Sequence, residues 1–367
     1  KGSNISFSGT NTFEANYSPN EGGAVTISSS GNIPSFTDVQ FKNNSADNQG
    51  GTIAILNGGA TLDGATSFLV SSSDKGGAVY ITNGTLTIND EVTFEDITAN
   101  DGGIIHMIGG IANIYAELKN TTANNGGAVY MTNGTANIYG VLSSNTALEN
   151  GGAICLSVDL PVVNVHNNLA GNNAVNGGAI YVQSGTISIS GDVSSSDVTF
   201  TNNQASGYGG AIYINGSRAK LNVVGTCPIV FSANNAANGG GAVYAYEGTI
   251  SNFTPIVTFS GNYTTNGDGG ALWLLTANQV PAGRLVFENN ESRGGSGGAI
   301  YIASDTTTSL TLDSATQYTF DNNVAGEYGG AIHTVASTIT LDGFVIDFEN
   351  SAKVGGGFAS SETGKIY

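Results

Sequence analysis

The hydrophobic positions of this chain fall in short segments, separated by turns rich in Gly, Asn, Ser and Asp. The clearest segment follows a Gly-Gly pair: two small or apolar residues come first, and aliphatic positions then flank a single, mostly aromatic position. Segments this short and this rich in Val, Ile and Tyr favour β-strands over helices. The Gly pairs begin at Gly22, Gly50, Gly76, Gly102, Gly126, Gly151, Gly177, Gly209, Gly240, Gly269, Gly297 and Gly329, and we interpret Gly356-Gly357-Phe358-Ala359 as a degraded closing copy.

Two further elements recur in phase with the Gly pair. Phe-x-x-Asn precedes it, with Leu in place of Phe in the middle units, and a Gly-Thr-led apolar segment follows it. The intact Phe-x-x-Asn copies begin at Phe13, Phe41, Phe200, Phe231, Phe259, Phe287 and Phe320, and the Leu copies begin at Leu142 and Leu169. The Gly-Thr segments begin at Gly84, Gly134, Gly185 and Gly248.

The spacing of these elements predicts the fold class. The Gly pairs are 24 to 32 residues apart, a period typical of solenoids, in which each unit buries its apolar face against its neighbours. Three short strands per unit predict an all-β, right-handed parallel β-helix of about thirteen rungs, continuous over residues 1–367. We expect the Phe residues to stack in the interior. We expect the Asn residues to occupy a left-handed corner and to bond along their own column.

Alternation along the strand after the Gly pair predicts an aromatic face. Because successive side chains point to opposite faces, the aliphatic columns should point inward and the column between them outward. The opposite polarity stays open, since both faces are apolar. The outward column reads Thr26, Ala54, Tyr80, His106, Tyr130, Cys155, Tyr181, Tyr213, Tyr244, Trp273, Tyr301 and His333.

Charge and composition exclude several classes of function. The formal net charge of −18 argues against binding to nucleic acid or to an anionic membrane surface, and it also keeps a large β-rich surface soluble. No apolar stretch approaches the length of a membrane span, and no secretory leader is visible. Cys155 and Cys227 lie more than two repeats apart, which is too far for a disulfide between stacked rungs.

Together, the repeated Gly-Gly-Ala-aliphatic tetrads and the Phe-x-x-Asn motifs resemble the polymorphic membrane proteins of Chlamydia-type bacteria. The resemblance covers essentially the whole chain. It implies a β-helical autotransporter passenger on the outer membrane or cell surface, or secreted, which acts as an adhesin on host cells. The family is exported by a signal peptide and a C-terminal barrel, through which alone it is attached to the membrane. We find neither in this chain and expect a passenger fragment cut at both ends.

An enzyme is the main alternative, because β-helices also host polysaccharide lyases and glycoside hydrolases. Glycoside hydrolysis needs two carboxylates at a defined distance, and the acidic residues here are scattered through turns without a recurring cluster. His106, His166 and His333 have no visible partners for a metal or a nucleophile. We therefore expect no catalytic residue, no metal and no cofactor.

The candidate binding residues lie in the C-terminal half. Tyr and Trp dominate protein recognition, so the outer aromatic column is one candidate; strand stacking is the competing role for it. All three arginines fall in the same region as the longest repeats, whose extra length should form outer loops. The candidates are Tyr181, Tyr213, Tyr244, Trp273, Tyr301, Arg218, Arg284 and Arg293.

The sequence thus predicts a non-enzymatic adhesin that binds a host-cell surface protein or glycan through the side of a β-helical rod. Self-association of the rod and a purely structural spacer remain open as alternatives.

Overall fold

The computed structural model describes residues 5–191, 197–251, 253–276, 279–303, 309–313, 317–342, 345–361 and 366. The chain divides into two compact units, Lys1–Ala174 with Ser184–Thr186, and Val175–Gln183 with Ile187–Tyr367. Both consist of stacked parallel β-coils, and no described residue lies in an α-helix. The prediction of an all-β solenoid is confirmed, whereas a single continuous domain stays a prediction. No helix in the described part of the chain is long and apolar enough to span a membrane.

In the first unit, strands pair in parallel with their equivalents in the neighbouring coils, as Val79, Tyr80 and Ile81 do with Ile53, Ala54 and Ile55 of the preceding coil. The strands that directly follow a Gly pair are β4 (Val25–Ser28), β7 (Ile53–Asn57), β10 (Val79–Ile81), β13 (Ile105–Ile114), β16 (Val129–Ile138) and β19 (Ile154–Leu156). The strands of the second apolar segment are β1 (Ser6–Ser8), β5 (Ser35–Thr37), β8 (Gly59–Asp63), β11 (Thr85–Ile88) and β20 (Val162–Val165). In β13 and β16 a single strand spans both segments. The strands at and after the Phe or Leu motif are β2 (Thr12–Glu14), β3 (Tyr17–Ser18), β6 (Gln40–Ala46), β9 (Ser67–Lys75), β12 (Thr93–Asp101), β14 (Leu118–Lys119), β15 (Thr122–Asn125), β17 (Leu142–Ser143), β18 (Thr146–Asn150), β21 (Leu169–Ala170) and β22 (Asn173–Ala174).

The second unit repeats this order more regularly. The first strands of its coils are β23 (Ile180–Val182), β27 (Ile212–Ile214), β31 (Val243–Ala245), β35 (Leu272–Leu274), β38 (Ile300–Ile302), β42 (Ile332–Thr334) and β45 (Phe358–Ser360). The second strands are β24 (Gly185–Ile189), β28 (Ala219–Val223), β32 (Thr249–Ile250), β39 (Ser309–Asp313) and β43 (Thr338–Asp342). The Phe strands are β25 (Val198–Thr201), β29 (Ile229–Ser232), β33 (Val257–Ser260), β36 (Arg284–Glu288), β40 (Gln317–Asp321) and β44 (Val345–Phe348).

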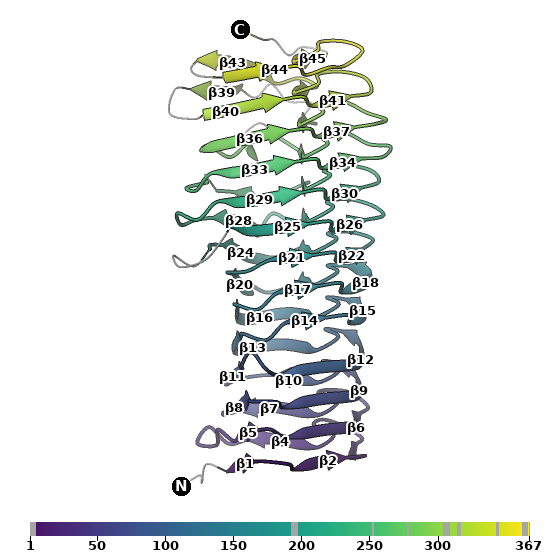
Figure 1. Cartoon of the computed structure of the whole chain (residues 1–367), viewed down its shortest axis with the longest axis vertical. Helices are drawn as coiled ribbons and strands as arrows, with labels where there is room; N and C mark the ends of the chain where they lie inside the picture. Colours follow the sequence, from purple (N-terminus) through teal and green to yellow (C-terminus); the bar gives the residue numbers. More distant parts are fainter. Residues whose placement is uncertain are drawn as a thin grey trace. The chain divides into compact units, whose positions relative to one another are not determined.

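In addition to the predicted strands, five coils form a strand of two residues directly after the Asn. These strands are β26 (Gln204–Ala205), β30 (Asn235–Ala236), β34 (Tyr263–Thr264), β37 (Glu291–Ser292) and β41 (Val324–Ala325). The buried Asn turns the chain out of the Phe strand, and the next two residues pair with the coil above. Figure 1 shows β29, β33 and β36 lying one above another, each followed by its short strand.

The predicted Phe column forms the core of both units. Phe200, Phe231, Phe259, Phe287 and Phe320 are fully buried, and their rings stack with centroids 4.7 to 5.1 Å apart. In the first unit Phe13, Phe41, Phe68 and Phe94 stack likewise, and only Phe13, in the first coil, is half-buried. The positions that flank the aromatic column are buried as predicted, except for Val25 in an outermost coil, which is half-buried.

The Asn column is confirmed, but the prediction of which residue is left-handed was wrong. The positive φ belongs to the third residue of Phe-x-x-Asn, for example Asn202 (φ 55°) and Ala233 (φ 52°). The Asn that follows is buried, because its amide must bond to the next coil: Asn203 donates through its backbone N and Nδ2 to Oδ1 of Asn234, at 3.0 and 2.9 Å. Asn234 Nδ2 returns a bond to the Phe200 carbonyl at 2.8 Å.

The two glycines of each pair have different roles. Gly209 has a φ of 66°, which a side chain would strain. Gly210 is required by close packing, since a Cβ there would lie 2.1 Å from the carbonyl oxygen of Gly241 in the next coil. The closing copy begins one residue earlier than predicted: Gly355 carries the positive φ, and Phe358 aligns with Ile332.

Candidate binding surface

The aromatic column of the second unit is in strict register. Tyr181 pairs with Tyr213, Tyr213 with Tyr244, Tyr244 with Trp273, Trp273 with Tyr301, and Tyr301 with His333. Tyr181 and Tyr213 meet edge to face at 5.4 Å, as do Tyr213 and Tyr244 at 5.0 Å. The indole of Trp273 then lies flat on Tyr244, with centroids 4.1 Å apart. We call these six side chains the aromatic stripe.

The stripe is less exposed than the sequence suggested. Tyr181, Tyr244 and His333 are buried, at 9%, 7% and 5% exposure, while Tyr213, Trp273 and Tyr301 are half-buried. The sequence predicted the direction of this column, and the structure adds that most of its surface is covered. The side chains do lie opposite the aliphatic core positions, but neighbouring rings cover them on both sides. Burial, together with nearby tyrosine hydroxyls, raises the pKa of Tyr213 to about 12 and raises that of Tyr244 as well.

Two further tyrosines extend this surface and were not singled out from the sequence. Tyr208, just before a Gly pair, lies 4.7 Å from Tyr244 and 6.0 Å from Tyr213 between ring centroids. Tyr246 is 45% exposed and lies 6.5 Å from Trp273, with nearly parallel rings. The period-2 alternation that placed Tyr244 outward also places Tyr246 outward, so the signal was present.

The three arginines do not gather on the stripe. Arg218 is exposed in the turn before β28, Arg284 is exposed at the start of β36, and Arg293 follows β37. Arg293 Nε bonds to Glu291 Oε2 at 2.8 Å, and its guanidinium lies 4.0 Å from the centre of the Tyr263 ring. The three residues thus occupy different places around the coil, and we do not assign them to one basic patch with the stripe.

The first unit carries a second aromatic column, which was not predicted from the sequence. Tyr115, Tyr139 and His166 stack with centroids 4.7 Å apart and ring planes within 8°. Each follows the last aliphatic residue of its strand, a spacing that could have identified the column. Tyr115 is 45% exposed, so this column is more open than the stripe.

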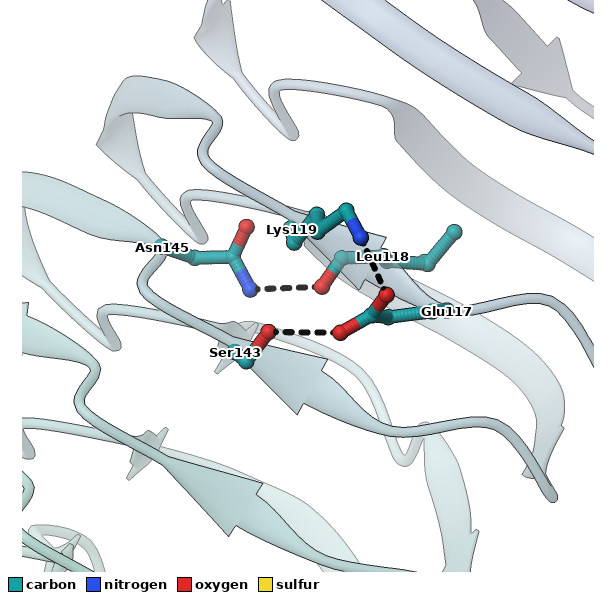
Figure 2. A network of polar contacts seen from close by, with 5 residues as sticks. All are labelled: Glu117, Leu118, Lys119, Ser143 and Asn145. Carbon is teal, nitrogen blue, oxygen red and sulfur yellow. Dashed lines mark hydrogen bonds and ion pairs between the residues drawn. The ribbon is translucent and has the colours of Figure 1, made fainter.

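Close to this column lies a small polar network that ties two coils together. Figure 2 shows Glu117 accepting bonds from Lys119 and from Ser143 Oγ, the latter at 3.0 Å. Both partners hold the pKa of the Glu117 carboxyl below its usual range, with Lys119 the larger cause. Beside it, Asn145 of the Asn column donates Nδ2 to the Leu118 carbonyl at 3.0 Å, so both side-chain and backbone groups join these two coils. We assign it a structural role.

The histidines and Cys155 take the column positions that the sequence indicated, apart from His166. His106 lies between Tyr80 and Tyr130, and His333 lies between Tyr301 and Tyr328. Burial lowers the pKa of both imidazoles to about 4. In the described ranges, no three His, Cys, Asp or Glu side chains are placed to hold a metal ion together.

Comparison with known proteins supports the resemblance noted in the repeats. Residues 197–215, 228–246, 284–303 and 317–335 match the family described as Chlamydia polymorphic membrane protein (Chlamydia_PMP) repeat. Each matched segment begins at or near a Phe strand and ends at the first strand of the next coil. No curated protein and no solved structure gives a significant match. Four segments of the second unit thus match polymorphic membrane protein repeats, and this match suggests a surface autotransporter passenger.

Proposed function

We propose that this chain, built from polymorphic membrane protein repeats, is an adhesin passenger that attaches bacteria to host cells. The partner is a host-cell surface protein or glycan, and binding requires no catalysis. The observation that carries the proposal is the aromatic stripe with its neighbours Tyr208 and Tyr246, a large aromatic surface held on rigid parallel strands. Rigid tyrosine and tryptophan side chains give extensive contact at low entropic cost.

The half-buried members are the ones that can contact a partner. Tyr213, Trp273 and Tyr301 keep part of their ring surface accessible, whereas Tyr244 is almost wholly covered by stacking. The stripe thus combines two roles: its buried rings hold adjacent coils together, and its accessible rings and edges face the partner. The scattered arginines contribute at most isolated contacts.

The test is adhesion of beads coated with the intact chain to cultured epithelial cells. We expect the chain to bind, and the combined change of Tyr213, Trp273 and Tyr301 to Ser to reduce binding at least tenfold, as loss of central aromatic contacts does. The matched control changes Tyr115 and Tyr139 of the second aromatic column to Ser. Equal loss in both variants, or adhesion by neither the chain nor its variants, would contradict the proposal.

A further inference from the structure

A groove opens beside the stripe in the second unit, at the corner between the first and second strands of three successive coils. Its volume is about 450 Å³, within the usual range for ligand sites. The described residues that line it are Ser217, Tyr246, Glu247, Gly248, Thr249, Leu275, Thr276 and Gln279. We call it the Tyr246 groove.

One wall of the groove is a tyrosine ring with an accessible face. Tyr246 is 45% exposed, in contrast to Tyr244, which is sandwiched in the stripe at 7%. The Trp273 ring lies near it, with the two ring centroids 6.5 Å apart and the ring planes inclined by only 19°. Tyr246 therefore offers exposed aromatic surface among the residues that line the groove.

Hydrogen bonds from Gln279 hold the turn after Tyr246 in place without a ligand. Gln279 is 6% exposed, and its Nε2 donates to the carbonyls of Glu247 and Gly248, both at 3.3 Å. Its Oε1 accepts from the backbone N of Thr276 at 3.1 Å. A buried amide that joins two coils in this way pre-organises the groove, which lowers the entropic cost of binding.

The other residues that line the groove indicate which kind of ligand it binds. Ser217, Thr249 and Thr276 provide hydroxyl groups that both donate and accept hydrogen bonds, and Leu275 adds apolar surface. Among the described residues that line the groove, Glu247 alone is charged, and its carboxylate repels anions. Arg218 follows Ser217 in the sequence but does not line the groove. An uncharged ligand rich in hydroxyl groups, with one apolar C–H face, matches this set.

We propose that the Tyr246 groove binds a neutral oligosaccharide, with one pyranose ring stacked on Tyr246. The axial C–H bonds of a pyranose present a weakly positive face to the π-system, while its hydroxyls reach Ser217, Thr249 and Thr276. A protein partner fits less well, because a stable protein interface buries about 800 Å² and some 20–30 residues on each side. This inference rests on the proposed adhesin function and specifies its ligand.

The intact chain contains a single tryptophan, and Trp273 stands beside the groove, so its fluorescence reports binding directly. The chain is first applied to an array of neutral hexose and N-acetylhexosamine oligosaccharides that also carries their sialylated and sulfated counterparts. The neutral sugars that bind are then titrated against Trp273 fluorescence, each beside its sialylated form. We expect saturable binding of neutral sugars and weaker binding of the acidic ones.

The matched variants are Tyr246→Ala and Tyr328→Ala. Tyr328 is similarly exposed, at 40%, and also stacks on one column residue, His333, but it does not line the groove. We expect the first variant to weaken sugar binding about tenfold, as loss of one aromatic stacking contact does, and the second to leave it unchanged. Absence of neutral binders, a preference for acidic sugars, or equal behaviour of the two variants would overturn the groove assignment.

Adhesion separates this inference from the function on which it rests. If the chain adheres to cells and Tyr246→Ala adheres equally well, the adhesin proposal stands and the oligosaccharide proposal fails. If the chain does not adhere at all, the adhesin proposal fails whatever the array shows.

Discussion

The Oδ1 atom of Asn290 accepts two hydrogen bonds from Asn262, one from its backbone N at 3.1 Å and one from its Nδ2 at 3.0 Å. Asn262 in turn accepts two from Asn234, and it also donates Nδ2 to the Phe231 carbonyl at 2.9 Å. Only a carboxamide offers an acceptor and two donors at this position. Asp lacks the donors, and Ser is too short, which explains why the fourth position of the motif is Asn.

Replacing Asn262 by Ala should destabilise the second unit by on the order of 3 kcal/mol, because it leaves several buried groups of Asn234 and Phe231 without partners. Chemical denaturation monitored by circular dichroism measures the change. Asn238→Ala, at an exposed position of the same unit, serves as the control and should shift stability by less than about 0.5 kcal/mol. Similar midpoints for the two variants would show that the Asn column contributes little.

Replacing Phe259 by Ala should cost about 3–5 kcal/mol, the usual cost of removing a fully buried aromatic ring. In a solenoid the loss falls first on the adjacent coils, so hydrogen exchange should accelerate in β29 and β36 before it does in distant strands. Phe259→Leu is the matched variant, because Leu142 and Leu169 already occupy equivalent buried positions. We expect it to cost less than about 1.5 kcal/mol. Exchange that accelerates evenly throughout the unit would contradict nearest-neighbour stacking.

Tyr244 and Tyr246 should respond differently to the same substitution. Tyr244→Ser removes a buried ring that stacks on Trp273 at 4.1 Å, and about 2–3 kcal/mol of stability should be lost. Tyr246→Ser removes an exposed ring and should leave the thermal melt nearly unchanged. The two melts, measured side by side, test the division between stacking and accessible rings. A larger effect at Tyr246 would reverse that division.

The buried imidazole of His333 predicts a loss of stability in acid. Its pKa is lowered by burial to about 4, from an ordinary value near 6.5, and neither ring nitrogen has a hydrogen-bond partner within the described structure. The unfolded chain therefore binds a proton at higher pH than the folded one does. The neutral imidazole therefore costs the folded chain no stability above pH 6.5. As the pH falls towards 4, the free energy of unfolding decreases by about 3 kcal/mol in total.

The His333→Phe variant isolates this effect, since Phe keeps a flat ring between Tyr301 and Tyr328 and cannot be protonated. Denaturation midpoints at pH 7.5, 6.5, 5.5 and 4.5 should fall less steeply for the variant than for the original chain. Carboxyl groups titrate in both proteins, so their effect cancels in the comparison. Parallel pH profiles would exclude His333 as the source of acid sensitivity.

The sequence by itself determined the repeat, its period and the identity of the core. Gly pairs, Phe and Asn recur in phase, and stacked coils assign them their places: a tight turn with closely approaching backbones, a buried ring, and an amide that bonds from coil to coil. Phe259 and Asn262 could therefore be assigned correctly, because their environment is set by the coils directly above and below, which carry the same residues.

The tertiary structure determined the features that depend on contacts between particular side chains of neighbouring coils. The left-handed residue is Ala233 and not Asn234, because the Asn amide has to point inward to reach the next coil. The burial of Tyr244 depends on rings from neighbouring coils, and the Tyr246 groove depends on Gln279, which lies 33 residues further along the chain, holding the turn in place. Such contacts join particular side chains of different coils, so a pattern averaged over the repeats does not reveal them.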